Sequence, residues 1–167
     1  GRLVTLLGSR RDALIKEWTS VAARTLRGRQ TEGELAQQIA EVHAALESVL
    51  GTAEGSVHSA DAGEARAMLS ELSRHWARQG FSPSETAMLV LGVKEALYGV
   101  LSAEGRGDVP ADFMDLSRLV DDMGLFTFEV YTKTREEILA DQTEQLLELS
   151  TPVVKLWEGI VAVPLIG

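Results

Sequence analysis

Histidine is the residue type in this chain best suited to chemistry near neutral pH, because its imidazole can take up a proton or bind a metal. The sequence holds three. His43 falls at helical spacing beside an apolar stripe, His75 lies next to Trp76, and His58 sits in a segment rich in Gly, Ser and Ala. Only His43 and His75 are therefore placed to face an apolar pocket. The simpler alternative, a partly buried imidazole bonded to neighbouring groups, is the interpretation that the sequence favours for both.

No other pattern indicates catalysis. The acid pairs Asp121-Asp122 and Glu136-Glu137 are adjacent in the sequence, so on a helix their carboxylates point in different directions. The chain has no Gly-rich phosphate loop, no HExxH or EF-hand pattern and no cysteine, which excludes thiol catalysis and thiol-ligated metals. We therefore predict that the protein is not an enzyme and holds no metal or cofactor. An enzyme whose polar cluster forms only in three dimensions is the alternative.

The charge balance limits the partners. The 167 residues carry a net charge of −9, with the basic residues dispersed among acids, whereas nucleic-acid binding needs clustered Lys and Arg. No stretch approaches the roughly 18 uncharged apolar residues of a membrane span, and no signal peptide opens the chain. We predict a soluble, cytoplasmic protein that binds neither nucleic acid nor membrane.

Hydrophobic periodicity predicts five helices. Capping residues mark two of the starts: Thr31 stands three positions before Glu34, and Ser82 and Glu85 form a capping box around a proline. The fourth helix is apolar nearly all round, which is typical of the middle of a bundle. The segment Gly51–Gly63 has no anchoring apolar cluster and is predicted to be a loop. The helices are expected at about residues 3–27, 31–50, 62–79, 83–101 and 111–149.

The last predicted helix carries a seven-residue repeat in its second half. One row at this spacing is mainly apolar and the neighbouring row is partly polar, which suits a weak coiled-coil contact between two chains. We call these residues the seam and predict that it forms a homodimer. A surface helix lying against its own domain is the alternative. The first row is Leu125, Thr132, Leu139 and Leu146, and the second is Phe128, Arg135, Gln142 and Leu149.

The hydrophobic period changes after the seam. Two β-branched runs, Val153–Trp157 and Ile160–Val163, flank Glu158 and Gly159, a pair that suits a two-residue hairpin turn. An isolated hairpin is marginal in water, so this one is expected to belong to a larger sheet. The sequence thus predicts a short β-hairpin over residues 150–167.

This terminal segment resembles a known junction. The run ELSTP ends at Pro152, and PLIG occupies Pro164–Gly167. With the hairpin pattern, these runs are similar to the start of a STAS domain, and more narrowly to the junction between sensor and STAS domain in RsbR-type stressosome proteins. Upstream, Arg11–Trp18 resembles the opening helix of the RsbR/RsbRD-type amino-terminal domain.

The resemblance implies an all-α fold, a five-helix globin-like bundle with a long C-terminal output helix, followed by the first hairpin of a truncated STAS domain. It divides the chain into a helical sensor domain over residues 1–131, a linker helix over 132–149 and the hairpin over 150–167.

The same resemblance implies a non-enzymatic sensory and dimerisation domain. In such proteins a stress signal passes through the long helix to a STAS core, which contains RsbS-type scaffold proteins and controls an RsbT-type kinase. That kinase phosphorylates the STAS domain, at positions expected beyond Gly167. These globin-like domains usually lack haem, so no cofactor is implied. A haem or small-ligand sensor is the alternative, with His43 and His75 as candidate axial ligands.

Overall fold

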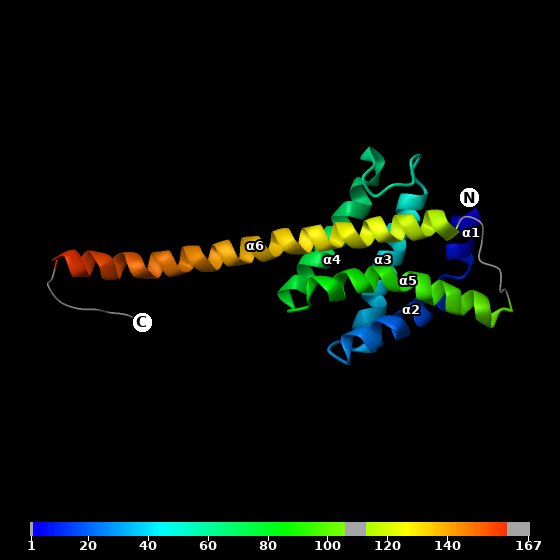
Figure 1. Ribbon diagram of the computed structural model, residues 1–167, viewed down its shortest axis with the longest axis horizontal. Coiled ribbons are helices and arrows are strands. Elements are labelled where there is room, and N and C mark those ends of the chain that lie inside the picture. The colour runs from blue at the N-terminus through cyan, green and yellow to red at the C-terminus, as the bar shows by residue number, and fades with distance from the viewer. Residues whose placement is uncertain (1, 106–112, 160–167) are drawn as a thin grey trace. The chain divides into compact units, whose positions relative to one another are not determined.

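The computed structural model of the protein describes residues 2–105 and 113–159, with side chains as far as Leu149. Every regular element in these residues is helical (Figure 1). The chain divides into two compact units, Gly1–Tyr131 and Thr132–Gly167. The elements are α1 (Arg2–Ser9), α2 (Arg11–Leu26), α3 (Glu32–Leu50), the 3₁₀ turn η1 (Ala60–Ala62), α4 (Gly63–Arg78), α5 (Pro83–Ala103) and α6 (Phe113–Gly159).

The first predicted helix is in fact two helices. α1 and α2 meet at Arg10, whose backbone angles (φ −110°, ψ 16°) lie outside the helical range. The break follows Gly8 and Ser9, which favour helix less than Ala or Leu does. Leu3 and Leu7 are the buried residues of α1. The described residues therefore form six α-helices, and the prediction of five is wrong.

The predicted β-hairpin is also wrong. The first predicted strand, Val153–Trp157, and the turn after it continue α6 as helix, and the second predicted strand lies in residues 160–167, outside the described part. β-Propensity is a preference that context overrides. A helix makes its backbone hydrogen bonds within the segment, whereas a strand pair needs further strands to be stable. In place of the expected five-helix bundle with a terminal hairpin, every regular element of the described residues is a helix.

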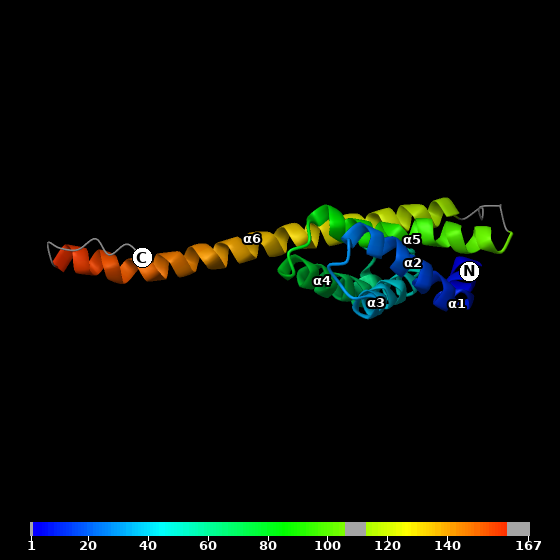
Figure 2. The ribbon, with the colours of Figure 1, turned by 90° about the horizontal axis from the view of Figure 1, so that it is seen from below.

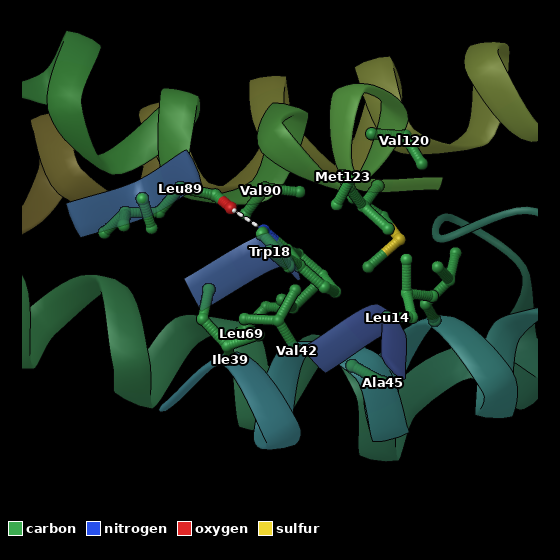
Figure 3. Packing of buried hydrophobic residues seen from close by; sticks show 14 of the residues in the cluster. Leu14, Trp18, Ile39, Val42, Ala45, Leu69, Leu89, Val90, Val120 and Met123 are labelled. Carbon is green, nitrogen blue, oxygen red and sulfur yellow. Dashed lines mark hydrogen bonds between the residues drawn. The ribbon is translucent and has the colours of Figure 1, made fainter. Parts of the chain in front are cut away.

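Trp18 of α2 lies in the middle of the hydrophobic core. Its side chain is fully buried, and its indole Nε1 donates a hydrogen bond of 2.7 Å to the carbonyl oxygen of Leu89 in α5. Figure 3 shows Trp18 between Leu89 on one side and Ile39 of α3 and Leu69 of α4 on the other. A methyl group at Gly92 would lie 3.4 Å from the Trp18 ring. Gly92 therefore serves close helix packing.

The start and the composition of α5 follow the prediction. Ser82 Oγ accepts a hydrogen bond of 3.1 Å from the Glu85 N–H, and Glu85 Oε1 accepts one of 2.9 Å from the Ser82 N–H, which completes the capping box. Thr31 caps α3, accepting from the Glu34 N–H at 3.2 Å. Among the described helices, α5 alone is long and apolar enough to cross a membrane, but half of that apolar window is buried inside the protein. Burial in the bundle accounts for its composition.

The segment between α3 and α4 is anchored, contrary to the prediction. Val57 is fully buried in the core. Arg66 Nη1 donates hydrogen bonds to the carbonyl oxygens of Val57 at 2.8 Å and of Ser59 at 2.5 Å. The ring of His58 meets that of Phe126 edge to face, with centroids 6.3 Å apart. One valine among small residues is too short a signal for periodicity to detect.

Candidate functional site

Within the unit Gly1–Tyr131, α6 is fixed to the bundle by polar contacts as well as by apolar packing. Lys94 Nζ of α5 donates a hydrogen bond of 2.6 Å to Asp121 Oδ1. Ser73 of α4 donates one of 2.7 Å to the carbonyl of Thr127, whose own hydroxyl donates to the Gly124 carbonyl at 2.7 Å. Figure 2 shows this part of α6 running beside α5. The buried apolar residues of α6 are Leu116, Leu119, Val120 and Met123.

Gly124 sets how closely α5 and α6 approach each other. A methyl group at this position would lie 3.2 Å from Leu91 Cδ2, closer than ordinary van der Waals contact between carbon atoms. Because Gly124 has no side chain, Leu91 packs against α6 at this position without having to shift. The face of α6 that meets α4 and α5 is thus occupied by contacts within its own bundle, and only its outer face is available to a partner.

The outer face of α6 in this unit exposes large apolar side chains. Leu125 is 63% exposed and Phe128 40% exposed, and both belong to the seam. Met114, two heptads before Phe128, is also exposed, as are Met88 and Tyr98 on α5. Exposed apolar groups that gather on one face often mark a surface that binds another protein.

The unit Thr132–Gly167 contains the remaining seam residues. α6 is helical through residues 132–149, so the seven-residue spacing places these side chains along one stripe. Leu139, Leu146 and Leu149 are 47, 64 and 71% exposed. The polar seam residues Thr132, Arg135 and Gln142 are exposed as well. The structure holds a single chain, so the homodimer itself stays a prediction.

His43 is buried beneath α1, with only 1% of its surface exposed. Its Nε2 lies 3.3 Å from the carbonyl oxygen of Leu7, to which it donates when protonated. Its Nδ1 lies 2.7 Å from Glu47 Oε1, one turn further along α3, although this pair lacks the alignment of a full hydrogen bond. Burial lowers the pKa of His43, against the opposing effects of the Glu47 carboxylate and the Leu7 carbonyl. Both nitrogens thus face protein oxygens.

The two candidate haem ligands are not brought together. His75 is exposed and lines a shallow hollow between α3 and α4, whereas His43 faces α1. The hollow around His75 is lined mainly by polar groups, Glu34, Gln37, Gln38, Glu41 and Glu71, which do not suit the apolar pocket of a haem. Among the described residues there is no group of three or more His, Cys, Asp or Glu side chains that could hold a metal ion.

The environment of His43 was not predicted from the sequence. Glu47 stands four residues after it, a spacing that brings two side chains together on a helix, so this partner could have been found. The Leu7 carbonyl could not, because it belongs to a separate helix that the sequence pattern joined to α2. The exposed side chains of Met88 and Tyr98 were also missed, since both lie in a helix that is otherwise apolar.

The comparison with protein families decides the assignment. Residues 12–146 match the family described as the RsbT co-antagonist protein rsbRD N-terminal domain. The chain belongs to this family. The match runs from the first turn of α2 through seven of the eight seam residues, and it leaves out α1. The predicted resemblance to RsbR-type stressosome proteins is thereby confirmed. No curated protein and no solved structure matches the chain.

Membership in the rsbRD N-terminal domain family gives the chain an RsbR-like regulatory role in the stressosome. Among the described residues, most of the exposed large apolar side chains belong to α6. The seam contains the exposed leucines of α6 at seven-residue spacing, so it is the candidate functional surface.

Proposed function

We propose that this domain is a non-enzymatic sensory and dimerisation module, in which two chains associate along the seam of α6. The observation that supports the proposal is the row of exposed leucines at seven-residue spacing in a helix whose other face, within the bundle, is already packed. Covering such a row removes apolar surface from water and stabilises the pair by about 25 cal/mol per Å².

In this proposal the seam carries a stress signal from the helical domain, residues 1–131, through the linker helix, residues 132–149, to a STAS core. The STAS core contains RsbS-type scaffold proteins and controls an RsbT-type kinase, in the cytoplasm. Family membership and the junction-like run at Pro152 support this assignment. Packed helix interfaces change between discrete arrangements rather than continuously, so a shift in the packing of the seam is the physical carrier.

Two adjacent leucines provide a matched test of the seam. Leu146 belongs to it and Leu147 does not, yet their exposed fractions are 64 and 63%. Leu146→Glu places a carboxylate inside the proposed contact in both chains, whereas Leu147→Glu makes the same chemical change outside it. We expect Leu146→Glu to weaken dimerisation roughly tenfold or more, from the apolar burial that it removes, and Leu147→Glu to leave it unchanged.

The measurement is the molar mass by light scattering over a dilution series, with helix content followed by circular dichroism. A dimer lost in the Leu146 variant and kept in the Leu147 variant supports the seam. Equal dissociation constants for the two variants, or a monomer for the unaltered chain at high concentration, would contradict the proposal.

A further inference from the structure

We propose that His43 makes the attachment of α1 to the bundle sensitive to pH, so that acidification releases α1. The proposal rests on the groups that surround a buried imidazole, and it goes beyond the proposed function because it uses no seam residue. α1 also precedes the range that matches the family.

The contact between His43 and α1 involves a backbone carbonyl near the helix end. The last four carbonyl groups of a helix have no partner within it, and Leu7 is among the last four residues of α1. His43 Nε2, 3.3 Å away, can supply the missing hydrogen bond only if it carries a hydrogen. A neutral imidazole with its single hydrogen on Nε2 therefore completes the end of α1.

The second nitrogen of His43 also faces an acceptor. Glu47 Oε1 lies 2.7 Å from Nδ1, and an ionised carboxylate cannot donate. A neutral imidazole can serve only one of these two acceptors, so a second proton would satisfy both but would also place a charge in a buried site. The other charged group acting on His43 is Arg11 at the start of α2, which opposes protonation and is itself paired with Asp12 at 3.2 Å.

The balance of these effects fixes the direction of the pH response. Burial is the largest influence and lowers the pKa of His43 below its ordinary value of 6.5. When α1 opens, the imidazole meets water and its pKa returns toward that value. The open form therefore binds protons more readily, so the attachment of α1 is strongest above pH 6.5 and weakens as the pH falls through the lowered pKa.

α1 is the element that such a change would free most easily. It has 8 residues, of which only Leu3 and Leu7 are buried. Isolated helices this short are not stable in water, so the helix depends on its attachment to the bundle. Local opening takes place first in segments with few buried contacts.

The absence of cysteine from the sequence allows a direct test with one introduced thiol. Leu3→Cys places it in the buried face of α1, and Gly8→Cys places it at an exposed position where a side chain meets nothing within 4 Å. The rate of reaction with a dipyridyl disulfide is measured for each between about pH 7.5 and pH 5.5, across the ordinary titration range of histidine. Dividing the Leu3→Cys rate by the Gly8→Cys rate removes the common effect of thiol ionisation.

We expect this ratio to rise on acidification, by up to about tenfold for each unit by which burial lowers the pKa. The rise should be absent when His43→Gln is added, because the amide can still donate to Leu7 but does not take up a proton. It should persist with His75→Gln, which changes an exposed histidine. A ratio that stays constant, or one that rises equally with His43→Gln, would overturn the proposal.

A second measurement covers the case in which His43→Gln does not fold. The proton NMR titration of the His43 ring gives its pKa directly, and Glu47→Gln removes the carboxylate that favours the charged imidazole. We expect Glu47→Gln to move both this titration and the rise in thiol reactivity to lower pH. If the two move independently of each other, His43 does not control α1.

Discussion

The two units of the chain use leucine in opposite ways. In Gly1–Tyr131, Leu7 and Leu14 have no exposed surface, whereas in Thr132–Gly167 Leu139 and Leu146 are 47 and 64% exposed. The first unit therefore obtains its hydrophobic stabilisation within one chain. The second has a comparable residue type but no hydrophobic cluster among its described residues, so we propose that a partner chain covers its apolar surface. In this proposal folding depends on the buried leucines and association on the exposed ones, which continue into the first unit at Leu125, so the two can be altered separately.

The largest effect on stability is expected from truncating a side chain at the centre of the first unit's hydrophobic core. Trp18→Ala should lower the free energy of unfolding by about 3–5 kcal/mol, because it leaves a cavity in the core and removes the hydrogen bond to Leu89. Urea denaturation followed by circular dichroism measures the loss. Trp18→Phe keeps a ring in the core and should cost less, while Tyr98→Ala, at a residue 62% exposed, should stay within about 0.5 kcal/mol. A Trp18→Ala loss no larger than that of Tyr98→Ala would show that the core is not centred here.

The second unit is expected to respond through association. Replacing Thr132, Arg135 and Gln142 together with Leu should tighten the dimer by at least about tenfold, since each buried leucine contributes roughly 1.5–3 kcal/mol in a well-packed contact. The dissociation constant from analytical ultracentrifugation tests this. In a full stressosome assembly, the same variant should also respond less to stress, because a tighter seam resists a change in packing. An unchanged dissociation constant together with an unchanged response would exclude the seam.

The smallest of these effects concerns one helix start in the first unit. Ser82→Ala removes the side-chain acceptor of the capping box and should cost about 1 kcal/mol, while leaving the dimer mass unaltered. Thermal melting and light scattering on the same sample measure the two quantities. Ser84→Ala is the matched control, because Ser84 lies in the same first turn of α5 but takes no part in the capping-box hydrogen bonds. A change in dimer mass after Ser82→Ala would indicate that folding and association are coupled after all.

Local signals predicted much of the helical bundle, because they depend on neighbours in the sequence. The caps at Thr31 and Ser82 and the burial of α5 followed from residues within one or two turns. The break at Arg10 did not follow, since the periodic pattern runs through it, and the backbone angles of Arg10 are what separate the two helices. The strand predicted over Val153–Trp157 was wrong because a local preference was overridden by its surroundings. Its β-branched residues have a strand preference, which the continuing helix overrides.

The candidate surface was predictable in part. The seven-residue spacing of the seam is visible in the sequence, but the exposed fractions of Leu125 and Phe128 depend on how α4 and α5 cover the other face of α6. Of the two acceptors around His43, Glu47 could be inferred from its helical spacing. The Leu7 carbonyl could not, because it is a backbone oxygen 36 residues away in the chain.

The two buried tryptophans also give the protein an intrinsic fluorescence signal that depends on helix packing. Trp18 Nε1 bonds to Leu89 across α2 and α5, and Trp76 Nε1 bonds to Gln38 Oε1 across α4 and α3, at 2.7 and 2.8 Å. Each fluorophore thus senses the separation of a different pair of helices. Trp157→Phe would remove the third tryptophan of the sequence. The emission of such a variant would distinguish a rearrangement at one helix pair from one at the other, without any attached dye.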